Sequence, residues 1–258
     1  MSYSDVATPP DAWLFSPVVK PAANPTRRRS RLVIERASTT PFERRLAAAE
    51  TIVAPSGNRH RAYLLGKRVT DVIGALCLFV LLAPVLLTTL VVLTITTKGR
   101  PLFSQPRAGY LGRPFRMWKF RTMRLDADRM QHTVANEISG PVFKNRRDPR
   151  ITRIGRWLRK TSIDEMPQLF HVLTGHMSLV GPRPLPIREI AQCDSWHRMR
   201  LGVVPSLTCL WQVSGRSEIG FDDWVRMDVR YIRTQSVRTD MALLWRTPWT
   251  VITGRGAY

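Results

Sequence analysis

One uninterrupted apolar segment, residues 72–97, most constrains how this chain can fold. It contains no charged residue, and as a helix it would extend about 39 Å, beyond the ~30 Å hydrocarbon core of a bilayer. We therefore expect a membrane element rather than the buried helix of a soluble domain. Residues 1–24 include Asp5 and Asp11 and no apolar run, so they do not predict a secretory signal.

The middle and the flanks of this segment bear on its topology. Ala83-Pro84 lies near its centre, where a proline removes a backbone hydrogen bond and kinks a helix. Both flanks are basic, with Arg59, Arg61, Lys67 and Arg68 before the segment and Lys98, Arg100, Arg107, Arg113, Arg116 and Lys119 after it. Because cytoplasmic flanks tend to be basic, a helix that bends at Pro84 and returns satisfies both ends, whereas a straight span satisfies one. The residues alone favour re-entry and leave the simple span open.

The rest of the chain divides into a tail and a globular body. Residues 1–60 hold several prolines and the basic block 27–31, which predict a poorly ordered basic tail. From residue 101 onward, strand-like and helical patterns alternate: Phe115–Phe120 is strand-like, and apolar residues recur at helical spacing across Thr152–Leu173, with breaks near Ser162 and Pro167. We expect a membrane helix at 61–100 and a small, helix-rich α/β body at 101–258 packed on it.

Composition narrows the possible partners without choosing among them. Forty Lys and Arg against nineteen Asp and Glu give a formal charge of +21, which attracts nucleic acid, anionic lipid or phosphorylated substrates. Cys77, Cys193 and Cys209 have no metal-ligand spacing, so reduced thiols are favoured over a disulfide framework. The sequence contains no Walker loop, no GxGxxG and no HExxH. The apolar stretch from Met241 to Ile252 is too short to span a bilayer, and its Trp245 and Trp249 suit a membrane interface.

The pair Asp164-Glu165 is the most pointed chemical feature. On spacing alone, adjacent acids are most often solvated surface charge. These two follow a run of basic residues, namely Arg147, Arg150, Arg153, Arg156, Arg159 and Lys160. In that setting the pair is suited to hold Mg²⁺, which prefers oxygen ligands and shares them with phosphates. One carboxylate could also attack phosphorus, with the arginines keeping it ionised and neutralising a diphosphate.

Three other patterns are suited to bind an anionic substrate. Pro182 and Pro184 flank Arg183 and would preorganise its guanidinium for a phosphate or a base, and the alternative is a rigid loop with an exposed arginine. Strand alternation would place Lys119 and Arg121 on one face, where a solvated edge strand is the alternative. The remaining candidates lie in LWQVSGRS at 210–217 and just after it: Trp211 for stacking unless it is core, Gln212 and Arg216 as polar groups, and Asp228 as a salt-bridge or supporting carboxylate.

Together these motifs resemble one family, the monotopic polyprenyl-phosphate hexose-1-phosphate transferases among the bacterial sugar transferases. The matching words are KFRTM at 119–123, DPRITRIGRWLRKTSIDEMPQLFHVLTGHMSLVGPRP at 148–184, LWQVSGRS at 210–217 and GRGAY at 254–258. The segment KRVTDVIGALCLFVLLAPVLL at 67–87 resembles the family's membrane motif. The resemblance covers about residues 65–258, and the closing GRGAY is similar to exopolysaccharide-type members.

The resemblance implies a mechanism. The membrane helix would be re-entrant and broken at Pro84, with the body on the cytoplasmic face of the bacterial inner membrane. Asp164 would attack the β-phosphate of a UDP-sugar, releasing UMP and leaving a phosphosugar on the enzyme, and undecaprenyl phosphate would then accept that phosphosugar. Glu165 would help Asp164 bind Mg²⁺, and Arg183 would contact the nucleotide. Lys119, Arg216 and Asp228 would lie in or near the site.

The resemblance also implies a place in exopolysaccharide assembly, as the first membrane step before downstream glycosyltransferases. The chain departs from the family pattern at Pro205-Ser206, where Pro-Gly is common, and at Ala83, where a serine often precedes the proline. Two rival hypotheses are a nucleic-acid-binding protein, which leaves the apolar segment and the acidic pair unexplained, and an inactive scaffold of the same fold.

Overall fold

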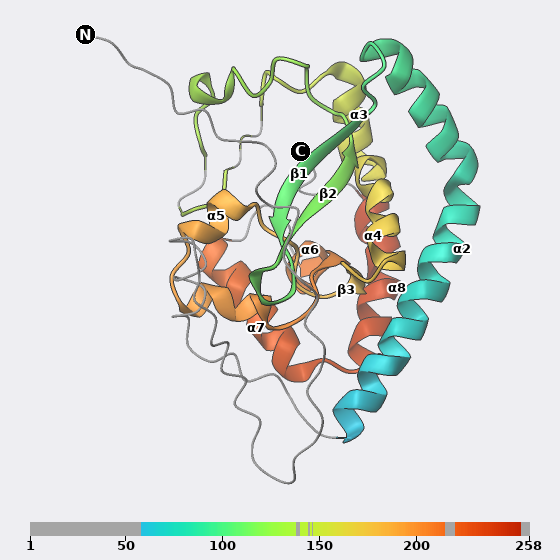
Figure 1. The fold of residues 1–258 in the computed structure, drawn as a ribbon, viewed down its shortest axis with the longest axis vertical. Helices are drawn as coiled ribbons and strands as arrows, with labels where there is room; N and C mark the ends of the chain where they lie inside the picture. Colours follow the sequence, from blue (N-terminus) through green and yellow to red (C-terminus); the bar gives the residue numbers. More distant parts are fainter. Residues whose placement is uncertain (1–57, 138–139, 144, 146, 215–219, 254–258) are drawn as a thin grey trace, which may run out of the picture. The chain divides into compact units, whose positions relative to one another are not determined.

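The computed structural model describes residues 58–137, 140–143, 145, 147–214 and 220–253. The expected tail at 1–60 therefore lies almost wholly outside the described residues, as do Arg216 and the closing GRGAY. The elements follow in this order (Figure 1): α2 (Asn58–Thr96), β1 (Leu102–Ala108), η1 (Tyr110–Gly112), β2 (Pro114–Phe120), η2 (Gln131–Thr133), α3 (Arg153–Lys160), η3 (Ile163–Gln168), α4 (Leu169–Leu173), β3 (Ser178–Val180), α5 (Ile187–Ala191), η4 (Trp196–Gly202), β4 (Ser206–Thr208), α6 (Leu210–Ser214), α7 (Phe221–Thr234) and α8 (Val237–Thr253).

The described residues form a helix-rich α/β body, as the sequence predicts, with two small sheets. β1 and β2 pair antiparallel, with Leu102 opposite Phe120 and Ala108 opposite Pro114. β3 and β4 pair parallel, with Ser178 beside Ser206 and Val180 beside Thr208. The strand expected at Phe115–Phe120 is β2. Each sheet ends close to a predicted site residue, because Lys119 lies in β2 and Arg183 follows β3.

Helix α2 runs unbroken through Pro84 and is long and apolar enough to cross a membrane. Figure 1 shows it as one bowed helix rather than two helices that double back. Pro84 has no N–H to donate to the carbonyl of Val80, so a bend is expected at this position. The hydroxyl of Thr88 donates to the Pro84 carbonyl at 2.8 Å, and Thr94 and Thr97 likewise donate to carbonyls one turn back. Such bonds satisfy these hydroxyls inside the helix, which suits an apolar surrounding.

One face of α2 packs against the body along nearly its whole length. Ala75, in its first half, shares a core with α4, β3, α7 and α8. Leu86 and Leu93, in its second half, share another core with Phe120 of β2 and Leu158 of α3. A third core, which includes Trp211, Trp224 and Val225, lies within the body. Both halves of the helix therefore contribute side chains to the hydrophobic cores of the body.

The segment 152–173 is helical, as its apolar spacing predicts, with the expected break at Ser162, while the chain passes from η3 to α4 without a break at Pro167. Thr152 caps α3, because its hydroxyl accepts a hydrogen bond from the N–H of Gly155 at 2.9 Å. Gly155 is required, since a Cβ there would lie 2.0 Å from the Thr122 carbonyl oxygen. Ser162 has φ 57° and turns the chain sharply between α3 and η3. A serine in this left-handed region costs on the order of 1 kcal/mol or more, and such strain often accompanies a functional site.

The apolar stretch from Met241 to Ile252 lies on α8, the helix that follows α7. α8 contains Trp245 and Trp249, whose exposed fractions are 87% and 71%. Val237, Met241 and Ile252 are exposed at compatible helical spacing, so these five side chains form one apolar stripe while Asp240 and Leu243 face the body.

Candidate active site

The carboxylate pair lies on the short helix that follows the strained serine. Asp164 and Glu165 occupy the first turn of η3, directly after Ser162 and before α4. Acidic groups in the first turn of a helix are favoured by the free N–H groups there. The side chain of Asp164 is only 6% exposed, so the common expectation of solvated surface charge does not hold here. Asp164 is a buried acid, and Glu165 is a partly buried one.

Glu165 is shared between two cations from different parts of the chain. Lys119 Nζ donates to Glu165 Oε1 at 2.8 Å. Arg183 donates to both carboxylate oxygens, with Nη1 2.9 Å from Oε2 and a second short contact from Nη2 to Oε1. Burial alone would raise the pKa of Glu165, but Arg183 and Lys119 outweigh it and hold that pKa below its ordinary value. Glu165 is therefore ionised and organises the site.

Asp164 differs from its neighbour because it makes no ion pair or hydrogen bond through its side chain to any described residue. Burial raises the pKa of Asp164 to about 6, and the adjacent Glu165 charge adds to this, while Lys119, Arg159 and Arg183 oppose it. A carboxylate without hydrogen-bonding partners keeps its lone pairs available. Near neutral pH it is largely ionised and is suited to act as a nucleophile.

Two arginines near the pair were not singled out by the sequence patterns. Arg159, on the last turn of α3, donates through Nε to the hydroxyl of Thr122 at 3.0 Å, and the charges of Asp164 and Glu165 both act on it. Arg107, in β1, donates to the carbonyl of Pro184 at 3.0 Å. Burial, followed by the nearby charge of Arg183, lowers the pKa of Arg107 to about 10. Each lies among many other arginines in the sequence, so only three-dimensional proximity distinguishes it.

The loop at 181–184 is held from both sides by backbone and side-chain bonds. Ser206 N donates to the Pro182 carbonyl at 2.8 Å, and the Ser206 hydroxyl donates to the Gly181 carbonyl. Arg200 Nη2 donates to the carbonyl of Arg183 at 2.9 Å. Ser206, which stands where the family often has glycine, thus helps to fix this loop. These bonds hold the loop in place, and Arg183 is partly buried and paired with Glu165 rather than exposed.

Asp228 lies behind this loop rather than beside the carboxylate pair. It is 1% exposed and forms an ion pair with Arg200 at 2.6 Å. Because Arg200 also holds the Arg183 carbonyl, Asp228 supports the site through one intermediate residue. Of the roles that the sequence left open for Asp228, the structure shows the salt bridge.

Other predicted site residues lie apart from the pair. Arg121 donates to the carbonyls of Arg100 and Leu102, at 2.8 and 3.2 Å, and makes no bond to the carboxylate pair among the described residues. Gln212 accepts a bond from the Cys209 thiol at 2.8 Å. Trp211 is core, stacked on Trp224 with 4.3 Å between ring centroids. The substrate-binding roles of Arg121, Gln212 and the undescribed Arg216 stay predictions.

The chemistry of the carboxylate pair limits how a magnesium ion could bind. Among the described residues, no cluster of three or more carboxylate, histidine or cysteine side chains is suited to a metal. Glu165 already accepts bonds from two cations, which leaves few free carboxylate oxygens. Mg²⁺ often binds through one or two carboxylates together with substrate phosphates. The pair fits this mode only if a diphosphate supplies most of the ligands.

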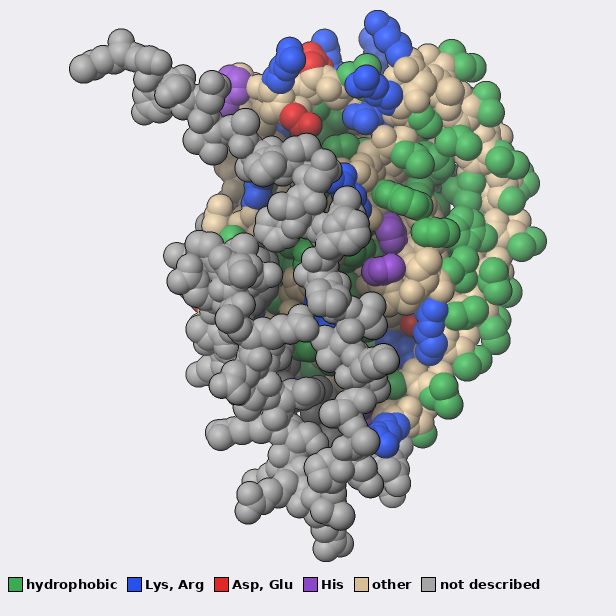
Figure 2. Space-filling model, viewed as in Figure 1, with side chains coloured by type: hydrophobic (Ala, Val, Ile, Leu, Met, Phe, Trp, Pro, Cys, Tyr) green, Lys and Arg blue, Asp and Glu red, His purple; other side chains and the backbone are tan. Residues whose placement is uncertain are grey.

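A broad apolar surface adjoins the body. The outward face of α2 exposes large side chains, including Val69, Ile73, Val80, Leu87 and Ile95. Figure 2 shows these hydrophobic side chains gathered along the edge of the molecule formed by α2. Contiguous apolar surface of this extent marks a membrane or protein interaction site. The basic side chains Arg153, Arg156 and Lys160 are exposed on α3, near the second half of this helix.

Comparison with known proteins relates this geometry to a family. The bacterial sugar transferase family model matches residues 62–254. The chain is 42% identical over 199 residues to a galactosyl transferase, CpsE, of Streptococcus agalactiae, covering 76% of this chain and 44% of that protein. It is 36% identical over 200 residues to undecaprenyl-phosphate galactose phosphotransferase of Salmonella typhimurium, covering 74% and 41%. It is 34% identical over 200 residues to the exopolysaccharide production protein ExoY of Sinorhizobium fredii, covering 75% and 88%.

The matches differ in how much of each relative they include. The chain spans less than half the length of the Streptococcus and Salmonella proteins and most of the length of the Sinorhizobium protein. The family model, from residue 62 to residue 254, includes most of α2, the carboxylate pair and the 181–184 loop. The chain belongs to the bacterial sugar transferase family.

Proposed function

We propose that this protein transfers a hexose-1-phosphate from a UDP-sugar to undecaprenyl phosphate, releasing UMP and forming undecaprenyl-diphosphate-sugar. The observation that carries the proposal is the unequal state of two adjacent carboxylates. Glu165 binds Lys119 and Arg183, while Asp164 is buried beside them without a hydrogen-bonding partner among the described residues. A free carboxylate held next to phosphate-binding cations is what a covalent phosphoryl transfer requires.

The reaction would proceed in two displacements at phosphorus. In the first, a carboxylate oxygen of Asp164 attacks the β-phosphorus of the UDP-sugar. The bond from that phosphorus to the bridging oxygen breaks, and UMP leaves with the electron pair. In the second, an oxygen of undecaprenyl phosphate attacks the same phosphorus, the bond to Asp164 breaks, and the carboxylate is restored. Arg183, Lys119 and Arg159 would neutralise the charge that builds up on the phosphoryl oxygens.

Mg²⁺ would be bound by oxygens of the carboxylate pair and of the donor diphosphate. When bound, it would neutralise diphosphate charge and favour departure of UMP. The residues of this chain orient the diphosphate. Arg183 is fixed by its flanking prolines and by Arg200, and Lys119 is fixed by its strand.

We further propose that the protein is monotopic, on the cytoplasmic face of the inner membrane. The body packs on both halves of α2, so a spanning helix would carry α3 and its exposed arginines into hydrocarbon. A helix that enters one leaflet and bows at Pro84 leaves both basic flanks in water. The apolar stripe of α8, with Trp245 and Trp249, would lie in the interface beside α2.

Labelling of introduced cysteines tests this topology. Gly66→Cys, where a side chain meets open space, and Lys98→Cys, which is exposed, lie at the two ends of the helix. In a Cys77→Ser background, a membrane-impermeant maleimide should reach both positions from the cytoplasmic side of inside-out vesicles. Labelling from opposite sides would establish a spanning helix instead.

Release of UMP and capture of the intermediate test the reaction. Purified, detergent-solubilised protein would be given a panel of UDP-sugars with Mg²⁺, with and without undecaprenyl phosphate. Without the acceptor, intact-protein mass spectrometry should find one added hexose phosphate with the correct donor, and the adduct should be absent from Asp164→Asn. Folded protein that forms no adduct and releases no UMP with any donor would contradict the proposal. An adduct on Asp164→Asn would exclude Asp164 as the nucleophile.

The names of the relatives suggest which donor sugar to test first and which pathway the reaction serves. The Streptococcus and Salmonella relatives are named for galactose, so UDP-galactose is the first donor to test. The Sinorhizobium relative is named for exopolysaccharide production, which supports a role as the first membrane step before downstream glycosyltransferases.

A further inference from the structure

The candidate site has two sides that belong to different elements. One side is η3 with Asp164 and Glu165, continued directly by α4. The other is the 181–184 loop with Arg183, which directly follows β3. The Arg183–Glu165 ion pair joins them. The geometry of the candidate site therefore depends on how α4 and β3 are held relative to each other.

Arg68 of α2 holds the first side. Its Nη1 and Nη2 donate to the carbonyls of Val172 and Leu173, at 2.5 and 2.6 Å. These carbonyls end α4, where helix carbonyls lack intrahelical donors and a positive charge is favoured by the helix dipole. A basic pair such as Lys67-Arg68 near the start of a membrane helix is usually expected to bind lipid headgroups. The guanidinium of Arg68 instead points toward the body and binds α4.

Asp71 of α2 holds the second side. It is 5% exposed, and its Oδ1 accepts the N–H of Leu179 at 2.9 Å and the hydroxyl of Ser178 at 3.1 Å. Both donors lie in β3, immediately before the 181–184 loop. Residues three apart on a helix share a face, so Arg68 and Asp71 act from nearly the same position on α2.

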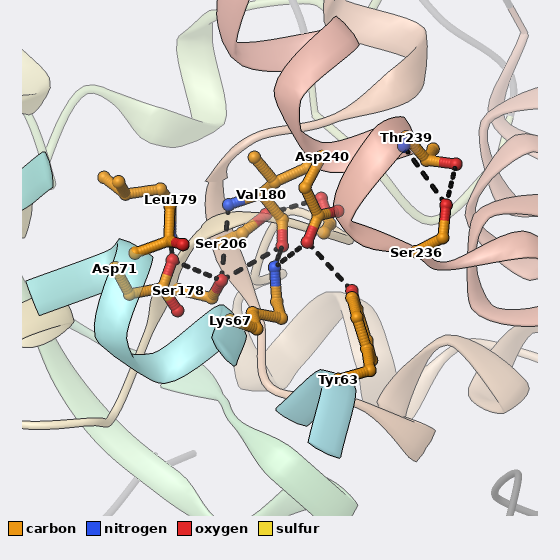
Figure 3. Close-up of polar contacts among 12 residues, drawn as sticks. Tyr63, Lys67, Asp71, Ser178, Leu179, Val180, Ser206, Ser236, Thr239 and Asp240 are labelled. Carbon is orange, nitrogen blue, oxygen red and sulfur yellow. Dashed lines mark hydrogen bonds and ion pairs between the residues drawn. The ribbon is translucent and has the colours of Figure 1, made fainter. Parts of the chain in front are cut away.

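A second set of bonds secures the same end of α2 (Figure 3). Lys67 donates to the carbonyl of Val180 at 2.8 Å and forms an ion pair with Asp240 of α8 at 2.9 Å. Asp240 also accepts the hydroxyls of Tyr63 and Tyr231, at 2.8 and 2.6 Å. These buried polar groups are satisfied by one another, and such networks favour a single arrangement. The start of the membrane helix is thereby fixed in rotation and depth against β3.

We propose that Arg68 and Asp71 are positioning residues for the transfer reaction: together they form a brace by which the membrane helix sets the separation of the nucleophile side from the Arg183 side. The inference rests on the proposed function. The brace consists of the bonds from Arg68 to α4 and from Asp71 to β3. It links the seating of α2 in the membrane to the assembly of the site, although neither residue touches Asp164, Glu165 or Arg183.

Single and double variants test the brace. Arg68→Gln and Asp71→Ala should each lower kcat about 10- to 100-fold with little change in KM, because a displacement near 1 Å at a reacting centre costs about that much. Because both bonds set one separation, the double variant should cost little more than the more damaging single one. Asp71→Asn keeps an acceptor oxygen for Leu179 and Ser178 and should retain most of the wild-type kcat. Thr89→Val, a buried position in the other half of α2, is the matched control and should resemble wild type.

Hydrogen exchange separates failure of the brace from failure of the proposed function. In Asp71→Ala, amides of residues 178–183 should exchange faster, and in Arg68→Gln those of 169–175 should, whether or not the donor is correct. If the wild type releases no nucleotide while these exchange changes occur, the proposed function fails and the contacts of the brace stand. Faster exchange with unchanged kcat in an active enzyme overturns the positioning role. Additive losses in the double variant, or equal losses in Asp71→Asn and Asp71→Ala, also overturn it.

Discussion

The loop before α3 and the turn after it both bury carboxylates among arginines, but they neutralise them differently. In the loop, the Asp148 side chain accepts hydrogen bonds from Arg150 and from no other described residue, with Nε 2.9 Å from Oδ1 and Nη2 2.6 Å from Oδ2, and it also accepts the Arg150 N–H at 3.0 Å. Although burial alone would raise the pKa of Asp148, these bonds lower it. In the turn, Glu165 accepts hydrogen bonds from Lys119 and Arg183, whereas the Asp164 side chain accepts none from the part of the chain that the structure describes.

This difference in bonding distinguishes a structural ion pair, Asp148–Arg150, from a reactive carboxylate pair, Asp164 and Glu165. Every hydrogen-bonding position of the Asp148–Arg150 pair that faces the carboxylate is used, so the pair gains nothing from a ligand. The turn after α3 carries excess positive charge from Lys119, Arg159 and Arg183 beside one carboxylate without a bonding partner, so an incoming phosphate would complete it. Arg159 lies between the two regions, since the charges of Asp148 and Asp164 both act on it. We expect substitutions in the turn to change activity and substitutions in the loop to change stability.

The largest expected effect is that of Asp164→Asn on activity. Removal of the attacking carboxylate should lower UMP release at least about a thousandfold, as for other covalent catalysts that lose their nucleophile. The folded state should not suffer, because burial already disfavours the ionised form of this side chain. Thermal unfolding in detergent should therefore occur at or above the wild-type temperature. Asp126→Asn, at an exposed surface ion pair, is the control, and a fall in unfolding temperature for Asp164→Asn would remove the distinction between the regions.

The second effect is that of Asp148→Asn on stability. Loss of the carboxylate leaves Arg150, which is 3% exposed, as a buried charge with an inadequate partner. Breaking a buried pair in this way costs about 3–5 kcal/mol. Denaturant unfolding should detect this loss, while kcat of the remaining folded enzyme stays within about threefold of wild type. A large fall in kcat at unchanged stability would place Asp148 in the site instead.

A third substitution lies between these extremes. Glu165→Gln leaves Lys119 and Arg183 buried without their shared carboxylate, so both activity and stability should fall. We expect kcat to drop about a hundredfold and the unfolding free energy to drop by about 3 kcal/mol. Parallel measurement of kcat and denaturant unfolding checks both. Loss of only one of the two properties would mean that Glu165 belongs wholly to one kind of region.

The sequence predicted the parts of this site that depend on local pattern. The acidic pair, the arginine between prolines and the strand carrying Lys119 were all found from neighbouring residues. The helix break at Ser162 was confirmed, whereas Pro167 lies inside η3 and does not interrupt it. Local pattern also predicted one long apolar helix, which is α2 and is long and apolar enough to cross a membrane. These features follow from backbone chemistry and hydrophobic spacing, which act over a few residues.

What the sequence did not supply depends on contacts between distant segments. Arg68 binds α4 and Asp71 binds β3, and each of these contacts joins residues more than a hundred positions apart in the sequence. Arg159 and Arg107 were hidden among many basic residues, and the bonds of Arg121 to the carbonyls of Arg100 and Leu102 could not be predicted from strand alternation. Residue type and spacing do not specify which arginine faces inward, because that depends on packing of the whole body.

The smallest expected effect, and the one that compares the two regions in a single sample, is the response to acid. With a folded-state pKa of about 6, Asp164 should become protonated below that pH, and kcat/KM should fall about tenfold per unit. Asp148 has a lowered pKa, so the stability it contributes is fully present above the unfolded value near ~3.9 and is lost only as pH falls through its lower folded value. Activity should therefore disappear reversibly between about pH 6 and 4, while the unfolding temperature keeps the Asp148 contribution. Measuring kcat/KM and thermal unfolding on the same preparations checks this, and a coincident loss of both would mean that acid inactivates the enzyme by unfolding it rather than by protonating Asp164.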